Sequence, residues 1–364
     1  MKSRTSRGQR TLDQGYFSSA DIWRIEQERV FRTSWLLAGH VSDLPESGSY
    51  ILFESGHDSV IVLRDGAGCL RAHHNVCRHR GTRLCDAPRG QLGKALRCAY
   101  HAWSYDLDGS LQNAPHMNEV AGFDKAQWAL KPAALAKWRG FIFVNLAPAP
   151  MPLTDALPLA GRFEHWPLEA LRSVHQTVYD IEANWKLLFH NYGECYHCPA
   201  VHPQLNRLTP FRNSENDLEE GPMLGGPMLL NNPQGSMTTG GERCAPPFAQ
   251  LTPGERARVY YYTLFPSAFL SLHPDYVLVH RVHPMAIGRT RVVCDWYFDD
   301  TASRRSGFEP SPAISFWDLT NRQDWALCEN AFKGVASIAW EPGPYSELES
   351  QLAAFDRHYL RLMC

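Results

Sequence analysis

The 364-residue sequence lacks three features, each of which would point to a class of protein. No apolar run approaches the roughly 18 residues that a membrane-spanning helix needs, so we expect no membrane insertion. There is no excess of one charge sign, because 36 basic and 38 acidic residues give a formal net charge of −2. Phosphate backbones are bound by clustered basic side chains, so nucleic acid is not an expected partner. The basic segment 1–10 is followed by no apolar stretch typical of a secretory signal.

The composition is that of a folded protein. Hydrophobic residues make up 44% and charged residues 20%, which excludes disordered, collagen-like and low-complexity chains. At about 150 residues per domain the length indicates two domains. Ten cysteines without an export signal favour a cytoplasmic location, where thiols stay free or bind metal.

The first half of the chain is predicted to be a helix followed by a small all-β domain. Residues 18–35 have helical spacing, and Ser18 or Ser19 can cap the helix. Residues 49–64 predict a β-hairpin with its turn at 55–58, and glycine-rich turns separate short strands beyond it. The proline-rich segment 147–160 indicates a domain boundary.

The second half mixes strands and helices. We predict a strand at 173–182, a helix at 184–197 running into Pro199, a hairpin of 276–284 with 290–298, and helices at 315–334 and 346–362. Strands and helices are segregated rather than alternating, so the predicted class is α+β.

The last helix has a clear amphipathic pattern. Ser346 and Glu349 have the spacing of a capping box. One apolar stripe follows, which we expect to be buried: Leu348, Leu352, Phe355, Tyr359 and Leu362.

One group of cysteines and histidines has metal-ligand spacing. Cys77 and His79 form C-x-H, and after eighteen residues Cys98 and His101 form C-x-x-H. Such a set could hold zinc or an iron–sulfur cluster. Zinc ribbons usually place two cysteines in one knuckle, whereas each knuckle here carries one cysteine and one histidine. This fits a [2Fe–2S] cluster with two cysteines on one iron and two histidines on the other.

A second group lies in the segment NWKLLFHNYGECYHCPAVHP, residues 184–203. His197 and His202 are five residues apart, and Glu194 precedes His197 by three, which on a helix places both on one face. Pro199 should break the helix and bring His202 back towards His197. Cys195 and Cys198 form a C-x-x-C pair, but a thioredoxin-like role requires a strand before it.

A third ligand is predicted from the helix at 315–334. Its inward stripe is Trp317, Thr320, Asp324, Leu327, Ala331 and Val335. A buried carboxylate without a cation is costly, so Asp324 either meets a metal or pairs with an arginine or a backbone amide. Two imidazoles and one carboxylate form the facial triad of non-haem Fe(II) sites. Glu329 is the competing carboxylate, but it points off the stripe.

Together these motifs resemble the Rieske non-haem iron (ring-hydroxylating) oxygenases, specifically their catalytic α subunit. The resemblance rests on NVCRHRG at 75–81, CAYHAWSYDLDG at 98–109, the segment 184–203, and QDWALCENAFKG at 323–334. The usual second knuckle has Pro and Gly where Ala99 and Ala102 stand, which we expect to be mild changes.

The resemblance implies a fold and two metal centres. A small all-β Rieske domain would span 36–150. A helix-grip catalytic domain, with an antiparallel sheet on a long C-terminal helix, would comprise 151–364 together with the N-terminal tail and helix at 1–35. By resemblance, Cys77 and Cys98 bind one iron of the [2Fe–2S] cluster and His79 and His101 bind the other. His197, His202 and Asp324 hold the mononuclear Fe(II).

The resemblance also implies an assembly. In this family an acid bridges the Rieske histidine of one subunit and an iron ligand of the next, and that position falls on Glu194. Electrons then cross a subunit boundary in a head-to-tail homotrimer. They come from NAD(P)H through a flavin/[2Fe–2S] reductase or a ferredoxin.

The expected activity is hydroxylation of a small organic substrate with O2. Glutamate at 194 and the segments around it look most like the branch that oxidises carnitine and glycine betaine. A methylated amine, losing a methyl group or undergoing C–N cleavage, is therefore the first expectation. Hydroxylation or O-demethylation of an aromatic compound is the alternative. A non-catalytic Rieske electron carrier would have no use for the residues beyond about 150.

A cationic substrate needs aromatic faces or a carboxylate. Tyr192 is the first candidate for such a face, because it lies close in sequence to Glu194. Other aromatic residues could form a cage, although core packing is the better expectation for most of them: Phe189, Phe211, Tyr260, Tyr261 and Tyr262.

Overall fold

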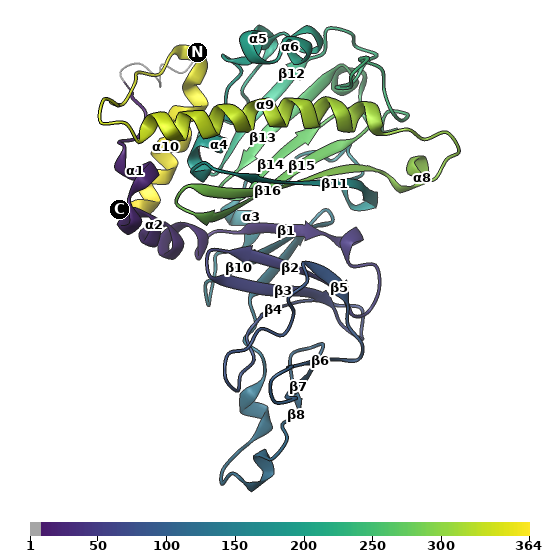
Figure 1. Ribbon diagram of the computed structural model, residues 1–364. Helices are drawn as coiled ribbons and strands as arrows, with labels where there is room; N and C mark the ends of the chain where they lie inside the picture. The colour runs from purple at the N-terminus through teal and green to yellow at the C-terminus, as the bar shows by residue number, and fades with distance from the viewer. Residues whose placement is uncertain (1–8) are drawn as a thin grey trace. The chain divides into compact units, whose positions relative to one another are not determined.

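The structure is a computed structural model that describes residues 9–364, so the first eight residues of the predicted tail lie outside it (Figure 1). The chain divides into two compact units. The smaller is Arg32–Met151, and the larger joins the chain up to Phe31 with Pro152–Cys364. The predicted divisions were after residues 35 and 150. No helix among the described residues has the length and apolar character needed to cross a bilayer.

The smaller unit is built from short antiparallel strands in three sheets. The first has the order β1 (Leu36–His40), β10 (Phe141–Asn145), β9 (Ala134–Trp138). The second has the order β4 (Leu70–His74), β3 (Asp58–Arg64), β2 (Ser49–Ser55), β5 (Arg89–Gln91). The third has the order β6 (Ala95–Arg97), β7 (Ser104–Asp106), β8 (Leu111–Asn113). The predicted hairpin is confirmed, because β2 pairs with β3 up to Ser55 and Asp58.

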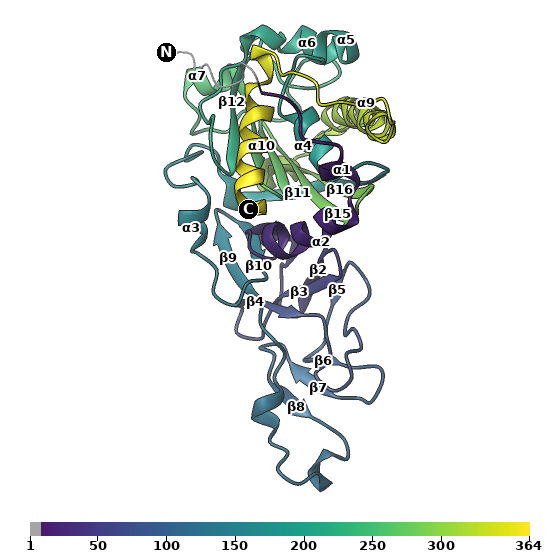
Figure 2. The same cartoon turned by 90° about the vertical axis from the view of Figure 1, so that its left-hand side faces the viewer.

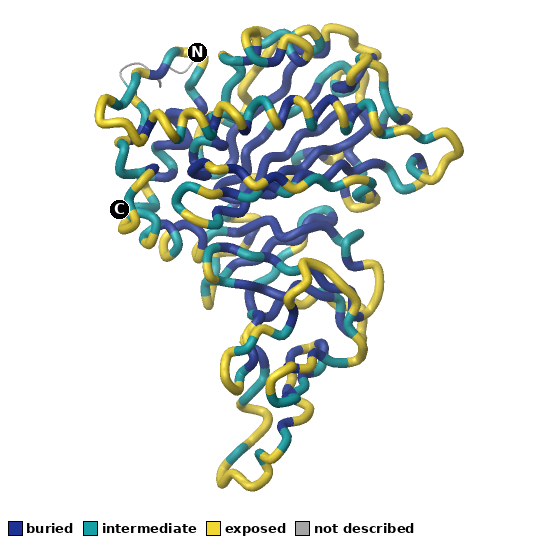
Figure 3. Tube along the Cα trace, in the orientation of Figure 1, coloured by how far each residue is buried: buried dark blue, intermediate teal, exposed yellow. Residues whose placement is uncertain are grey.

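The larger unit contains one six-stranded antiparallel sheet. Its strand order is β11 (Leu171–Ile181), β16 (Arg289–Asp299), β15 (Val277–Ala286), β14 (Ala268–Leu272), β13 (Arg258–Leu264), β12 (Met223–Leu229). Both the strand at 173–182 and the hairpin of 276–284 with 290–298 are confirmed as β11 and the β15–β16 pair. Most residues of its strands β14, β15 and β16 are buried and appear dark blue in Figure 3.

The long helix α9 (Ser311–Val335) lies across one face of this sheet (Figure 1), and Figure 2 looks nearly along its axis. Its buried residues include Phe316, Trp317 and Thr320, which face the sheet. The α+β class is therefore confirmed, with a small all-β unit and an antiparallel sheet covered by a long C-terminal helix.

The other helices of the larger unit are mostly short. They are α1 (Gly15–Ser18), α2 (Ala20–Glu26), α3 (Leu153–Ala156), α4 (Trp185–Tyr192), α5 (Cys198–Val201), α6 (Pro203–Leu208), α7 (Pro253–Arg256), α8 (Asp300–Ser303) and α10 (Ser350–Met363).

The helix predicted at 18–35 is shorter in the structure, where α2 spans Ala20–Glu26. Ser19 caps α2 by accepting a hydrogen bond from the Ile22 amide at 3.4 Å. After α2 a π-helical turn, Gln27–Phe31, ends the helical segment, because the chain then extends into β1. Trp35 belongs to the smaller unit, where its indole N–H donates to the Met151 carbonyl at 2.8 Å.

The stripe of the last helix is confirmed only in its centre. Leu352, Phe355 and Tyr359 are buried, whereas Leu348 is 52% exposed. Leu348 lies in the 3-10 turn Glu347–Glu349 before α10, so the helical period does not reach it. Glu349 accepts a hydrogen bond from the Ser346 amide at 2.8 Å, which supplies half of the expected capping box.

A buried ion pair joins the N-terminal segment to the rest of the larger unit. Lys186 at the start of α4 is fully buried and contacts Glu26 of α2, with 2.5 Å between Nζ and Oε1. Tyr359 of α10 and the Trp185 indole also donate to the Glu26 carboxylate, at 2.6 and 3.1 Å. Burial lowers the pKa of Lys186, and Glu26 opposes that shift. Three helices that are distant in sequence therefore share one desolvated charge cluster.

This cluster generates a stability prediction. Lys186→Met should lower the free energy of unfolding by ~3–5 kcal/mol, because it leaves the Glu26 carboxylate buried and unpaired. Combining it with Glu26→Gln should recover much of the loss. Urea unfolding followed by tryptophan fluorescence measures both. Lys333→Met, an exposed position near the end of α9, is the control and should change stability by at most about 0.5 kcal/mol. Equal effects at positions 186 and 333 would contradict the role of the ion pair.

Candidate metal centres

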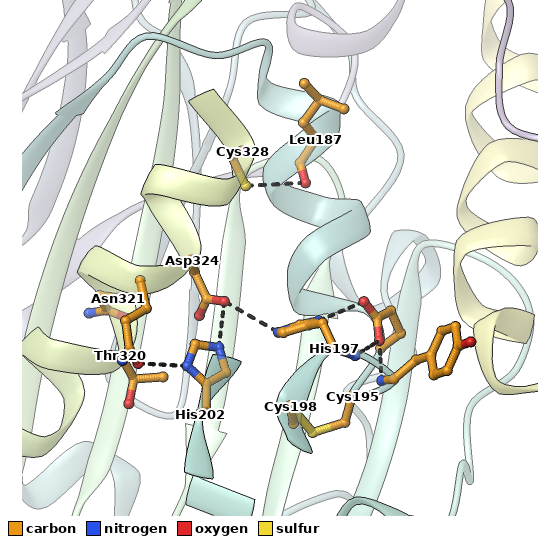
Figure 4. Close-up of polar contacts among 12 residues, drawn as sticks. Leu187, Cys195, His197, Cys198, His202, Thr320, Asn321, Asp324 and Cys328 are labelled. Atoms are coloured by element: carbon orange, nitrogen blue, oxygen red, sulfur yellow. Dashed lines mark hydrogen bonds and ion pairs between the residues drawn. A yellow bond between two sulfur atoms is a disulfide. The ribbon is translucent and has the colours of Figure 1, made fainter. Parts of the chain in front are cut away.

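The larger unit brings together the three predicted ligands of a mononuclear site. One ligand atom from each of His197, His202 and Asp324 lies within 4.8 Å of the others. Asp324 Oδ1 is 3.3 Å from His197 Nε2 and 2.8 Å from His202 Nε2. Figure 4 shows both imidazoles turned towards this carboxylate. Two imidazole nitrogens and one carboxylate oxygen are the donor set of a facial-triad iron site.

The local backbone differs from the predicted continuous helix at 184–197. Asn184 caps α4, and Gly193 ends the helix by donating its amide to the Phe189 carbonyl at 3.0 Å. Pro199 lies in the first turn of α5, where a missing N–H costs nothing, so it begins a helix rather than breaking one. The expectation that Glu194 and His197 share a helix face is wrong, since both lie in the turn between α4 and α5.

Glu194 and His197 nevertheless meet. Glu194 Oε1 lies 2.6 Å from His197 Nδ1, while Oε2 accepts from the His197 amide at 3.2 Å and from the Tyr196 amide. A carboxylate on Nδ1 holds the ring in one orientation and leaves Nε2 for a metal. This is the hydrogen-bonding environment expected around a ligating histidine.

His202 is oriented by a residue that sequence reasoning did not single out. Gln323 Oε1 lies 2.8 Å from His202 Nδ1, so Nε2 again faces Asp324. Gln323 immediately precedes Asp324 in α9. That adjacency is the only sequence signal for its role.

The electrostatics of the three ligands are those of a site that holds a cation. Burial raises the pKa of Asp324, but hydrogen bonds from His197 and His202 outweigh it and lower the pKa. Burial lowers the pKa of His197, but its bonds to Asp324 and Glu194 outweigh this and raise the pKa to about 10. The carboxylates thus favour positive charge at the position where a metal ion would bind.

The contacts of Asp324 and Glu329 differ from those that the alternatives for the third ligand require. The Asp324 carboxylate contacts histidines rather than an arginine or a backbone amide. Glu329 accepts a hydrogen bond from the Glu182 amide at 3.0 Å, outside the site. The predicted stripe was partly wrong, because Leu327 is 38% exposed and Ala331 is exposed. The buried face turns instead through Asn321, Trp325 and Cys328. Asn321 and Trp325 contact His280 of β15, and the Cys328 thiol donates to the Leu187 carbonyl of α4 at 3.6 Å.

A disulfide joins Cys195 and Cys198, with their Cα atoms 5.0 Å apart (Figure 4). The expectation that all thiols stay free or bind metal is therefore wrong for this pair. The bridge closes the turn that carries His197.

A cavity of about 130 Å³ adjoins the three ligands. A 150 Å³ cavity holds a molecule of about the size of benzene, so this volume suits a small substrate. Tyr261 and Trp317 line it, with ring centroids 6.0 Å apart and planes at 69°. The Tyr261 hydroxyl is buried and has no hydrogen-bond partner among the described residues.

The predicted aromatic face, Tyr192, also lines the cavity, but one side of its ring stacks on Phe269 at 4.2 Å. Its hydroxyl lies 2.8 Å from Ser271 Oγ. Tyr192 is thus largely engaged in core packing, and Tyr261 and Trp317 are better placed as faces. The other aromatic candidates do not line the cavity: Phe189, Phe211, Tyr260 and Tyr262.

The smaller unit brings the predicted cluster ligands together in two pairs, Cys77 with Cys98 and His79 with His101. Cys77 and Cys98 are buried, whereas His79 is exposed and His101 half-buried, with the two imidazole centroids 4.7 Å apart. Burial and the neighbouring Cys98 raise the pKa of Cys77, although the Tyr105 hydroxyl at 3.4 Å opposes this. His101 Nδ1 is buried and unpartnered among the described residues, which leaves it available as a ligand. Inner thiolates and outer imidazoles fit a Rieske-type cluster.

Both knuckles have the same backbone turn. The Gly81 amide donates to the Cys77 carbonyl at 3.0 Å, and the Ala102 amide donates to the Cys98 carbonyl at 3.1 Å. Gly81 has φ of 80° and Ala102 has φ of 58°. The left-handed region costs an L residue roughly 1–2 kcal/mol, so alanine at 102 is strained where glycine would not be. Despite this strain, Cys98 lies beside Cys77 and His101 lies beside His79.

Comparisons with known proteins follow the same division. Residues 168–364 match the ring hydroxylating alpha subunit (catalytic domain) family, and residues 34–124 match the Rieske [2Fe-2S] domain family. The glycine betaine monooxygenase oxygenase subunit of Chromohalobacter salexigens is 30% identical over 94% of this chain and 83% of its own length. The carnitine monooxygenase oxygenase subunit of Escherichia coli is 35% identical, over 53% of this chain and 52% of its own.

Solved structures share the fold. The quaternary ammonium Rieske monooxygenase CntA superposes with a TM-score of 0.84 at 22% identity, over 97% of this chain and 95% of that chain. Naphthalene 1,2-dioxygenase from Rhodococcus sp. gives 0.77 at 21% identity, over 97% and 94% of the two chains.

The ligand geometry predicts the effect of removing Asp324. Asp324→Ala should abolish binding of the mononuclear iron and turnover, and it should leave the visible and electron paramagnetic resonance spectra of the cluster intact. The two centres share no ligand and lie in different units. Metal analysis of the purified chain measures the loss. Glu329→Gln is the control and should retain iron. Full iron content in Asp324→Ala would show that the carboxylate is structural.

Proposed function

The chain belongs to the Rieske non-haem iron (ring-hydroxylating) oxygenases as a catalytic α subunit, and we propose that it hydroxylates a methyl group of a small methylated ammonium compound. It is an oxidoreductase that carries a [2Fe–2S] cluster and a mononuclear iron and receives electrons from a reductase or other electron partner. The observation that carries the substrate proposal is the cavity beside His197, His202 and Asp324. It combines the aromatic faces of Tyr261 and Trp317 with carboxylates, which is what a quaternary ammonium head requires.

The proposal assigns each set of ligands to one metal centre. Cys77, Cys98, His79 and His101 hold the cluster, and His197, His202 and Asp324 hold the mononuclear iron. When bound, that iron supplies the binding and reduction of O2. The protein orients the ligands through Glu194 and Gln323, and the cavity beside them holds the substrate next to the iron.

The proposed reaction is a monooxygenation of an N-methyl group. One atom of O2 enters the C–H bond of an N-methyl group, and the other leaves as water with two electrons and two protons. The resulting N–CH2–OH group loses its hydroxyl proton, the C–N bond breaks, and its electron pair returns to nitrogen. Formaldehyde and the demethylated amine are the products. Attack on a different carbon next to nitrogen would instead cleave the C–N bond to a longer group.

We further propose that Glu194 bridges the two kinds of centre across a subunit boundary. Its contact with His197 supports one half of this bridge, and the other half would be the Rieske histidine of a neighbouring subunit in a head-to-tail homotrimer. The structure of CntA is described as revealing inter-subunit electron transfer. The electron partner would be a flavin/[2Fe–2S] reductase or a ferredoxin using NAD(P)H, and the assembly would be cytoplasmic.

Glu194→Gln tests the bridge. An amide would present its NH2 group either to the Nδ1–H of His197 or to the amides of Tyr196 and His197, and both are donors. Both metal centres should remain bound, while oxidation of the reduced cluster by O2 and substrate slows by about a hundredfold. Stopped-flow absorption of the cluster measures this rate. Glu219→Gln, which makes the same change of charge on an exposed loop, should leave it unchanged; equal rates in wild type and Glu194→Gln would contradict the bridge.

Product analysis tests the substrate class. With a reconstituted reductase, methylammonium compounds should give formaldehyde in step with NADH consumption, and Asp324→Ala should give none. Hydrogen peroxide is measured alongside, because uncoupled turnover consumes NADH without product. Binding of no methylammonium compound, together with coupled hydroxylation of an arene, would replace this proposal with the aromatic alternative.

A further inference from the structure

Resting on the proposed function, we infer that the substrate is a methylated ammonium cation whose other end carries no negative charge, and that Glu215 sets this preference. Glycine betaine and carnitine, after which the relatives are named, both carry a carboxylate as well as the ammonium group. The charges around the cavity of this chain favour a substrate whose other end carries no carboxylate.

The described side chains that line the cavity include carboxylates but no lysine or arginine. Two of the carboxylates, Glu194 and Asp324, are already engaged with His197 and His202. The third, Glu215, has no side-chain hydrogen bond or ion pair among the described residues. A cationic substrate therefore finds one uncommitted counter-charge, which lies on the exposed part of the cavity lining.

Glu215 is held against the cavity by its backbone. Its amide donates to the Pro227 carbonyl at 2.9 Å, and the Asp217 amide donates to the Gly225 carbonyl at 3.0 Å, so the segment 214–218 runs along β12. The approach is close enough that a Cβ on Gly226 would lie 1.9 Å from the Glu215 carbonyl oxygen. Gly226 is thus required for the loop to reach this position, and the position of Glu215 follows from it.

The rest of the polar lining is uncharged. Asn191, Asn216, Thr263 and Gln351 offer amide and hydroxyl groups. These groups can hydrogen-bond a hydroxyl or an amide at the far end of a substrate. A substrate carboxylate at the far end, in contrast, would lose its hydration without gaining a lysine or arginine partner and would face the charge of Glu215. The cavity thus favours compounds such as choline over zwitterions such as glycine betaine.

The test compares ligands that differ little except in charge. Isothermal titration of the anaerobic, iron-loaded enzyme is performed with glycine betaine, glycine betaine amide and choline. The amide is nearly isosteric with the carboxylate, so size does not confound the comparison. The amide and choline should bind at least about tenfold more tightly than glycine betaine.

Variants then locate the preference. Glu215→Gln should weaken binding of the amide and of choline by about tenfold and should leave binding of glycine betaine unchanged or improved. The matched control is Glu219→Gln, which removes the same charge from the same loop outside the cavity lining and should alter neither. Asn216→Lys, which places a cation on the wall, should improve binding of glycine betaine.

The outcomes separate this inference from the function on which it rests. Tighter binding of glycine betaine than of its amide, or equal effects of Glu215→Gln and Glu219→Gln, would overturn the inference and leave a methylammonium oxygenase. Failure of all three ligands to bind, with binding of an arene instead, would overturn both.

Discussion

The buried ion pair between Glu26 and Lys186 is the constraint on which the candidate iron site depends. Lys186 lies in the first turn of α4, and the last residue of that helix, Tyr192, leads through Gly193 directly into Glu194. A charge buried in a medium of low polarity tolerates little displacement from its partner, so α4 has one position relative to α2 and α10. The turn that carries His197 begins from that position. The position of His197 thus depends on the Glu26–Lys186 ion pair, although neither of these two residues is a proposed ligand.

The two centres are built in different ways. The four cluster ligands come from two turns of equal geometry, in which an amide four residues on closes onto each cysteine carbonyl. Local chain geometry therefore suffices to place them. The proposed ligands of the mononuclear iron come from the segment between α4 and α6 and from α9, more than a hundred residues later. They meet only because α9 packs on the sheet. Damage to tertiary packing should therefore affect the second centre before the first.

The close approach of His197, His202 and Asp324 could be predicted from the sequence because metal chemistry favours a few residue types at short spacings. Hydrophobic periodicity predicted β11, the β15–β16 hairpin and the helices α9 and α10 of the larger unit, but it missed the strands β12, β13 and β14. The path of the chain between α4 and α5 could not be predicted. Proline breaks a helix when it lies inside it but is well tolerated in its first turn. Because α4 ends at Gly193, Pro199 lies in the first turn of a new helix. Gln323 and Glu215 were missed for a related reason. Their roles depend on the packing of α9 and β12, which no local pattern encodes.

The division of the chain has a consequence for synthesis on the ribosome. Residues 32–151 are contiguous, so the smaller unit can fold as soon as it has left the exit tunnel. The larger unit cannot, because Glu26 and Lys186 complete their cluster only with Tyr359, which follows Glu26 by 333 residues. Glu26 can meet Lys186 and Trp185 earlier, but its contact with Tyr359 forms only after all of these residues have been made. Assembly of the [2Fe–2S] cluster can precede the mononuclear iron site in time, and a ribosome that stalls late would release a chain with the first centre only.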